Sequence, residues 1–217
     1  MKKLIFLLLM QPVFGQVYQW SNNESDTEIV YKLQMDSTYL IETVYQKNPS
    51  KFLSTRGGFY ETKDDLLTVR LEFNSNFKND SILNLEYSIP IKAKIISRLK
   101  IDLDGKWLMA GKVNLKGEER RRDLSRSRKT LKFLTDGFFQ WTAYNTETFE
   151  FFGCGGGRYE ANEGDYYESI VYFSRDNTRS GQTLSFKYEQ KENDWHHTGF
   201  SSKGLPLHEI WTLRQTE

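Results

Sequence analysis

Apolar and polar residues alternate in short runs along most of the chain. In the segment 183–189, for example, apolar side chains occupy every even position and polar side chains every odd position. This period of two is typical of a β-strand with one face in the core and the other in solvent. No long stretch shows the three-to-four-residue spacing of an amphipathic helix. The pattern therefore predicts an all-β protein.

The part of the chain after residue 104 divides into eight such strands. We expect them at 105–111, 129–135, 138–144, 149–161, 166–174, 183–189, 195–200 and 207–214. Polar or glycine-containing turns separate the strands, and Asp136–Gly137 is a strong two-residue hairpin turn because glycine readily takes positive φ. An antiparallel meander of eight strands closes naturally into a barrel, whose interior holds side chains or one small ligand.

The chain also repeats itself at an offset of 99 residues. Phe52 is matched by Phe151, and the glycine pair Gly57–Gly58 is matched by Gly156–Gly157. Several further positions agree with only small drift, which indicates a duplicated unit of about 100 residues. A unit of this length is long enough to be a domain of its own.

The duplication sets the expected domain organisation. Residues 16–104 form the first copy, and residues 105–217 form the second. The strand pattern of the first copy becomes unclear after Ile89, so we expect a shortened, partly open barrel that packs against the second and supports it. The predicted fold is all-β, with two tandem antiparallel meander barrels.

The first 15 residues resemble a signal peptide. Met1–Lys3 is basic, Leu4–Met10 is apolar, and Gly15 offers a small residue for cleavage. The apolar run is too short for a transmembrane helix, which needs about 20 residues, and no later segment qualifies. We therefore expect a mature protein that begins near Gln16 and is secreted or periplasmic.

Composition and charge narrow the function classes. The 217-residue chain has a formal net charge of +1, and loss of the signal peptide removes two lysines, so no nucleic-acid partner is expected. The single cysteine, Cys154, cannot form an intramolecular disulfide. A chain of about 200 residues can bury a core large enough to stabilise the fold without a disulfide. The sequence does not indicate an oligomeric state.

Charge is distributed unevenly between the two ends of the predicted second barrel. The longer connections carry basic residues, namely Arg120, Arg121, Arg122, Arg126, Arg128, Arg175, Arg179 and Lys203. The short turns at the other end carry acidic residues, namely Asp136, Glu163, Asp165, Glu192 and Asp194. One interpretation is a basic open mouth that favours anionic or amphipathic ligands. The other is a set of solvated loops whose charges are balanced by nearby acids.

Seven short motifs carry a family resemblance. They are Gly105–Trp107, Arg128–Lys132, Gln140–Asn145, Gly155–Tyr159, Phe173–Asp176, Asp194–His197 and Glu209–Trp211. Together they resemble a group of uncharacterised secreted bacterial proteins with tandem lipocalin-like domains. The resemblance spans the expected mature chain, is most specific from 105 to 214, and departs from the pattern after about Ile89. It implies a calycin-type barrel and brings no assigned catalytic residues.

Several motifs favour structural explanations over chemistry. The glycine run 153–157 continues as a strand, whereas a phosphate-binding loop would open a helix, so we expect a bend or bulge there. Cys154 has no base nearby in sequence and is expected to be a small core residue. His196 and His197 are adjacent in a strand and point to opposite faces, so they do not form a metal site together. Neither a metal nor a cofactor is expected.

A set of aromatic and basic residues in the second copy gives the candidate ligand-binding site. It comprises Trp141, Tyr159, Tyr167, Arg175, Arg179, Trp195, His197 and Trp211. If the barrel is hollow, the rings line it, and the arginines could hold a carboxylate. Alternatively, the rings fill the core and Arg179 and Arg175 pair with Asp176 within their loop.

These observations lead to three hypotheses. The first is a secreted, non-enzymatic binding protein that holds a small apolar or anionic ligand in the second barrel. The second is a structural or interaction protein of the cell envelope with filled barrels. The third, which has the least support, is an enzyme that uses Glu160, His197 and Arg175 inside the barrel. No catalytic residue is assigned.

Overall fold

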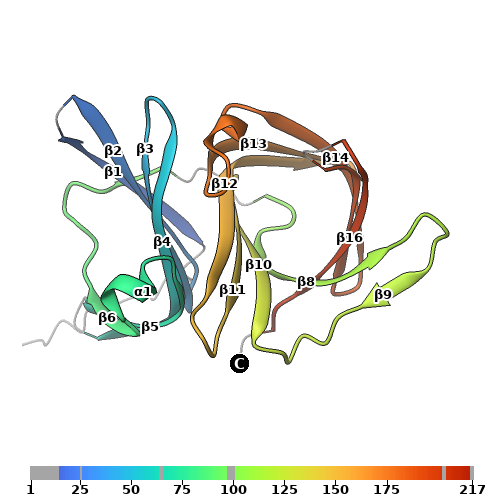
Figure 1. Ribbon diagram of the computed structural model, residues 1–217, viewed down its shortest axis with the longest axis horizontal. Coiled ribbons are helices and arrows are strands. Elements are labelled where there is room, and N and C mark those ends of the chain that lie inside the picture. Colours follow the sequence, from blue (N-terminus) through green and yellow to red (C-terminus); the bar gives the residue numbers. More distant parts are fainter. Residues whose placement is uncertain (1–14, 25, 64–65, 97–100, 202–203, 216–217) are drawn as a thin grey trace, which may run out of the picture.

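The computed structural model of the protein is all-β and contains two antiparallel sheets side by side (Figure 1). It describes residues 15–24, 26–63, 66–96, 101–201 and 204–215. The expected signal peptide lies outside the described residues except for Gly15.

Among the described residues, the first sheet has seven strands, and one short helix lies beside it. In chain order the elements are β1 (Gln16–Glu24), β2 (Thr27–Met35), β3 (Tyr39–Gln46), β4 (Lys51–Lys63), β5 (Leu66–Asn74), α1 (Phe77–Asp80), β6 (Asn84–Tyr87) and β7 (Lys94–Ile95). Their order in the sheet is β6-β5-β4-β3-β2-β1-β7. Within the described residues no pairing joins β6 to β7, so this sheet is open, in keeping with a shortened first copy.

The second sheet closes into an eight-stranded barrel. Its elements are β8 (Gly105–Val113), β9 (Glu119–Arg121), β10 (Arg128–Thr135), β11 (Phe138–Asn145), β12 (Phe151–Asn162), β13 (Asp165–Phe173), η1 (Asn177–Arg179), β14 (Thr183–Lys191), β15 (Asp194–Phe200) and β16 (Pro206–Leu213). Neighbouring strands pair from β10 to β16, and β8 closes the barrel by pairing with both β16 and β10. All eight predicted strands are confirmed.

Local turn chemistry explains the tight hairpins of the barrel. Asp136 and Gly137 have φ values of 47° and 79°, and Glu163 and Gly164 have 49° and 87°. Two successive residues with positive φ match the right-handed twist of the flanking strands. Strand β9 was not predicted, because its polar sequence lacks alternation. It pairs with the end of β8 and forms an arm that projects from the barrel (Figure 1).

The repeated glycine pair has a structural cause. In both copies the strand pairing shifts by one residue, between Gly57 and Gly58 in β4 and between Gly156 and Gly157 in β12. A Cβ atom on Gly157 would lie 1.9 Å from the backbone oxygen of Ser169. The same atom on Gly58 would lie 2.0 Å from a backbone oxygen of the neighbouring strand. The predicted bulge is therefore present, and only glycine fits it.

The two copies contact each other through equivalent faces. Tyr45 packs on Tyr172 with ring centroids 5.1 Å apart, and Phe73 packs on Tyr144 at 4.9 Å. Tyr45 and Tyr144 occupy the same position in the two copies. So do Phe73 and Tyr172, because Phe73 pairs with Gly57 and Tyr172 pairs with Gly156. Reciprocal contacts of this kind define a two-fold, isologous interface.

A buried acid ties the two sheets together. Arg214, just after β16, donates two hydrogen bonds of 2.8 Å to the two carboxylate oxygens of Glu72 in β5. Tyr39 and Tyr144 donate to the same carboxylate at 2.8 and 2.9 Å. Burial alone would raise the pKa of Glu72, but the Arg214 hydrogen bonds and charge outweigh burial and lower it.

The interface also buries a lysine without a hydrogen-bond partner. Lys32 on β2 is 2% exposed, and its Nζ has no partner among the described residues. The amine lies 4.8 Å from the centre of the Tyr172 ring. Burial lowers the pKa of Lys32 from its ordinary 10.5 to about 7. The residue at the same position of the second copy is Leu131. Leu131 packs with Tyr39 and Phe73 of the first copy, on the other side of the same interface.

Replacing Gly157 with alanine tests the close approach at the bulge. The added methyl group would overlap the backbone of β13, so we expect Gly157→Ala to lower the free energy of unfolding by more than about 3 kcal/mol. Urea denaturation measures this. Ser169→Ala, which changes only an exposed side chain opposite, is the control and should change stability by less than about 0.5 kcal/mol. Equal effects of the two changes would contradict the bulge argument.

Replacing Lys32 with methionine tests the cost of the buried amine. The folded pKa near 7 lies below the unfolded value of 10.5, so wild-type stability rises with pH across that window and the full cost applies below pH 7. We expect Lys32→Met to stabilise the protein by about 1–4 kcal/mol at pH 6 and to flatten this pH dependence. Lys187→Met, at an exposed ion pair, is the control and should show neither effect.

Candidate functional site

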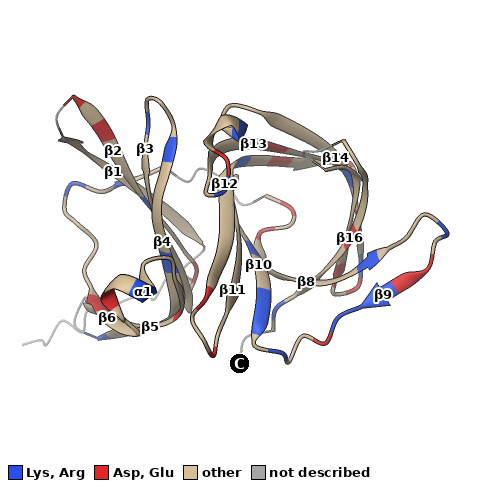
Figure 2. Ribbon diagram, in the orientation of Figure 1, with Lys and Arg blue, Asp and Glu red and all other residues tan. Residues whose placement is uncertain are grey.

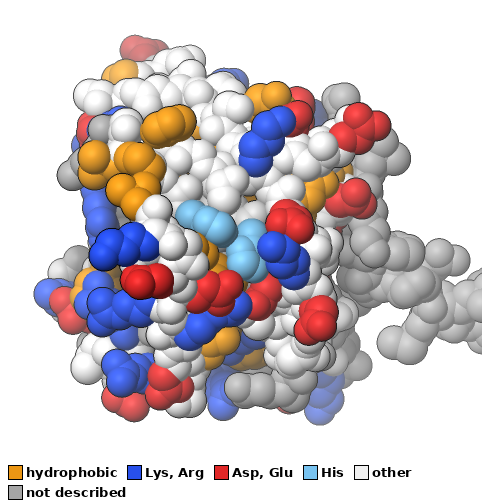
Figure 3. Space-filling view, turned by 90° about the vertical axis from the view of Figure 1, so that its right-hand side faces the viewer, with side chains coloured by type: hydrophobic (Ala, Val, Ile, Leu, Met, Phe, Trp, Pro, Cys, Tyr) orange, Lys and Arg blue, Asp and Glu red, His pale blue; other side chains and the backbone are white. Residues whose placement is uncertain are grey.

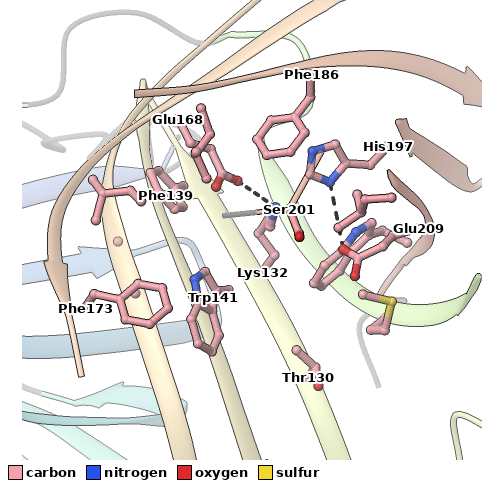
Figure 4. A pocket seen from close by; sticks show the side chains of 17 residues that line it. Thr130, Lys132, Phe139, Trp141, Glu168, Phe173, Phe186, His197, Ser201 and Glu209 are labelled. Carbon is pink, nitrogen blue, oxygen red and sulfur yellow. Dashed lines mark hydrogen bonds and ion pairs between the residues drawn. The ribbon is translucent and has the colours of Figure 1, made fainter. Parts of the chain in front are cut away.

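A cavity of about 250 Å³ lies inside the second barrel (Figure 4). Its wall is mostly apolar, with Met109, Phe139, Trp141, Ile170, Phe173, Leu184, Phe186, Leu207 and Trp211. The residues that line the cavity lie near the starts of β10, β14 and β16 and near the ends of β13 and β15. The cavity is therefore at the end of the barrel where the longer connections join the strands. This is the end at which the sequence predicts a mouth.

The opposite end of the barrel is filled by aromatic rings. Trp107 and Trp195 pack edge to face at 5.7 Å, and Tyr166 packs on Trp195 at 5.0 Å. Tyr159 lies against Tyr166 and donates a 2.5 Å hydrogen bond to Asp104 before β8. The barrel is therefore closed at the end with short turns and hollow at the other.

A buried ion pair forms part of the cavity wall. Lys132 Nζ on β10 lies 2.7 Å from Glu168 Oε1 on β13, and both side chains are less than a tenth exposed. Tyr166 donates a 2.9 Å hydrogen bond to the same oxygen. The ammonium also lies 4.8 Å from the ring centre of Trp211 and 5.0 Å from that of Trp195, which stabilises its charge.

His197 on β15 is the most unusual polar group in the cavity. It is 2% exposed, and neither ring nitrogen has a hydrogen-bond partner among the described residues. Its Nδ1 lies 4.0 Å from Glu209 Oε2 on β16, which is too long for a hydrogen bond. Burial, followed by the charge of Lys132, lowers the pKa of His197 well below 6.5, so the ring is neutral at pH 7.

Three of the predicted ligand-binding residues line the cavity. They are Trp141, His197 and Trp211. Trp195 lies directly behind them, stacked on His197 at 5.2 Å and on Trp211 at 6.1 Å. Four residues from three strands, predicted from residue type, thus meet in one place.

The other two predicted aromatic residues do not reach the cavity. Tyr159 plugs the closed end, and Tyr167 is 40% exposed on the outer wall. Side chains alternate along β13, so Tyr166 and Glu168 point inward and Tyr167 points outward. Tyr167 was predicted from its residue type, but the alternation of β13 turns its side chain away from the cavity.

The predicted arginines hold loops together and do not line the cavity. Arg175 Nε donates a 2.8 Å hydrogen bond to the carbonyl oxygen of Phe152, and Arg179 lies 3.3 Å from Asp176. In the long connection after β8, Arg121 pairs with Glu119 and with Asp194. Lys203 lies outside the described residues. The arm carries charges of both signs, as Figure 2 shows, which favours the interpretation of balanced loops.

The acids and the lysine of the cavity were not predicted from the sequence. Lys132, Glu168 and Glu209 all lie in strands, at positions that alternation assigns to the interior. A charged residue at an inward position is the signal that could have found them. Glu160, considered for catalysis, is exposed on the outer wall of β12.

The outer wall holds the other two histidines. His196 Nδ1 and His208 Nε2 are 3.0 Å apart, and Figure 3 shows histidine side chains on this face among acidic and basic groups. As predicted, His196 and His197 point to opposite faces. Across the described ranges, no cluster of three or more His, Cys, Asp or Glu side chains is placed to hold a metal ion. Cys154 is fully buried, and burial raises the pKa of its thiol.

No protein-family model matches the chain, and no curated protein shows significant sequence similarity to it. In the part of the chain that the structure describes, no helix is long and apolar enough to cross a lipid bilayer.

Replacing Lys132 with methionine tests the ion pair in the cavity wall. Glu168 would then stay buried without a cation, so we expect a loss of about 3–5 kcal/mol in the free energy of unfolding. Lys132→Met combined with Glu168→Gln should cost less than Lys132→Met alone, and denaturant titration of the full mutant cycle measures the difference. Lys47→Met, at the exposed pair with Glu28, is the control. Strictly additive effects would contradict direct coupling.

Proposed function

We propose that the protein is a non-enzymatic binding protein that holds a small, largely apolar ligand in its second barrel. The observation that carries this proposal is a cavity with an apolar wall and an unpartnered, fully buried histidine. Binding sites typically combine such a wall with a few converging polar groups. The expected signal peptide would place this binding outside the cytoplasm.

The alternative of a small anionic ligand has weaker support. Neither Arg175 nor Arg179 lines the cavity, and the one lysine among its described lining residues, Lys132, is already paired with Glu168. Two carboxylates, those of Glu168 and Glu209, face the interior. A ligand carboxylate would meet both of them in a poorly solvated space.

The other two hypotheses fit the structure less well. A purely structural role requires filled barrels, whereas the second barrel is hollow at one end. The three residues of the enzyme hypothesis do not lie together. Glu160 is on the outer wall, Arg175 holds a loop, and only His197 of the three lines the cavity. His197 and Glu209 are 4.0 Å apart, which is too long for the hydrogen bond that an acid–base pair would share.

A larger hollow of about 470 Å³ between the two sheets is a poorer candidate. Its lining includes Glu72 and Arg214, which already satisfy each other. None of the described buried side-chain atoms without a partner belongs to a residue that lines it. Among the described residues, this hollow therefore has no buried polar side-chain atom that lacks a hydrogen-bond partner.

Filling the cavity tests the proposal. Native mass spectrometry of the purified protein should detect a bound small molecule, and Thr130→Phe should abolish it because the new ring occupies the cavity. Thr68→Phe, at an exposed position of β5, is the matched control and should retain the ligand. Both variants should keep the circular dichroism spectrum of the wild type. Equal ligand retention by both variants would place the binding site elsewhere.

A further inference from the structure

A polar corner interrupts the apolar wall of the cavity at a place separate from the Lys132–Glu168 pair. It is made by His197, Glu209 and Trp211, and we call it the His197 corner. All three residues line the cavity, and they come from the neighbouring strands β15 and β16. The indole Nε1 of Trp211 is buried and, like both nitrogens of His197, has no partner within the described residues. Buried polar groups are costly unless they are hydrogen-bonded, so this corner is built to receive a polar atom.

The distance between His197 and Glu209 indicates which kind of ligand atom fits the His197 corner. His197 Nδ1 and Glu209 Oε2 are 4.0 Å apart. An oxygen about 2.8 Å from both atoms closes this triangle at an angle of roughly 90°, which a hydroxyl group tolerates. A neutral imidazole can donate from Nδ1, whereas an ionised carboxylate only accepts. A hydroxyl group can accept from the first and donate to the second.

The charges and the hydrogen-bonding groups around the cavity together favour an uncharged ligand. Lys132 is paired with Glu168, and Glu209 lies 3.4 Å from Lys112, whose side chain is mostly in solvent. An anionic ligand in the corner would therefore be repelled by the Glu209 carboxylate, and no unpaired cation of the described lining residues would offset that repulsion. A ligand ammonium group would be attracted to Glu209, but it has no lone pair to accept a hydrogen bond from His197 Nδ1, and it would lose its hydration in the apolar cavity.

We propose that the ligand of the second barrel is an uncharged apolar molecule with a hydroxyl group, which hydrogen bonds between His197 and Glu209. This inference rests on the proposed binding function and adds the chemical class of the ligand. The rings of Trp141, Phe173 and Phe186 hold the apolar body of the ligand, and the His197 corner holds its hydroxyl group. The cavity volume suits a body of about two fused aromatic rings, since a cavity of about 150 Å³ accepts benzene.

Four probes of one shape separate the possibilities. We would measure binding of 2-naphthol, naphthalene, 2-naphthylmethylamine and 2-naphthoate to the full-length mature protein at pH 7 by calorimetry or tryptophan fluorescence. They present a hydroxyl group, no polar group, a cation and an anion on the same ring system. We expect 2-naphthol to bind about tenfold more tightly than naphthalene, and the two charged probes to bind more weakly than 2-naphthol.

Two variants locate the preference. His197→Phe keeps a ring in the core, and we expect it to bind naphthalene as well as the wild type does while losing the tenfold gain for 2-naphthol. Glu209→Leu, near the rim of the barrel, should lose most of the same gain. His196→Phe, on the outer wall of the same strand, is the matched control and should keep it. All variants are compared only after their circular dichroism spectra match.

Each other outcome has a definite meaning. If naphthalene binds as tightly as 2-naphthol, the cavity binds apolar molecules but the hydroxyl inference is overturned. If the amine or the carboxylate binds best, the ligand class is wrong and the proposed function stands. If no probe binds, both the inference and the proposed apolar binding fail. If His197→Phe keeps the full preference for 2-naphthol, the hydroxyl group lies outside the His197 corner.

Discussion

The backbones of two neighbouring strands approach so closely at the repeated glycine pair that no side chain fits between them. At Gly157 the limit is the backbone of β13, and at Gly156 the phenol of Tyr172 occupies the space a side chain would need. Tyr172 thereby reaches Gln140, whose side chain also contacts Thr43 and so connects the two copies. On the inner face, Gly155 leaves space for Trp141 and Phe173 at the cavity wall. One glycine-rich strand therefore shapes the bulge, the interface and the cavity together.

Most of the fold could be predicted from local pattern. Alternation and turn residues gave eight strands of the barrel, because half-buried strands impose a period of two on the sequence. The repeat gave the bulge, since a glycine pair retained in both copies at a strand position indicates close backbone contact. Strand β9 was not predicted because both of its faces are in solvent, so its sequence has no alternation of apolar and polar residues.

The candidate site could be predicted only in part. Residue type alone identified Trp141, His197 and Trp211, but it also selected Tyr167, which alternation turns outward, and two arginines that hold loops. The ion pair of Lys132 with Glu168 depends on which strands become neighbours across the barrel. Such a pair is set by barrel closure, and a single sequence does not show how far the strands are staggered.

The reciprocal packing of the two copies has a consequence for how the molecule is held together. Each copy covers, with its own surface, the same surface of the other, as the two subunits of a symmetric dimer do. Here one polypeptide supplies both halves, so their association is unimolecular and does not weaken on dilution. The linkage also frees the halves to diverge: Lys32 now stands where its counterpart is Leu131, and the cavity with the His197 corner lies in the second half. The open half can thus act as a permanently tethered subunit for the hollow one.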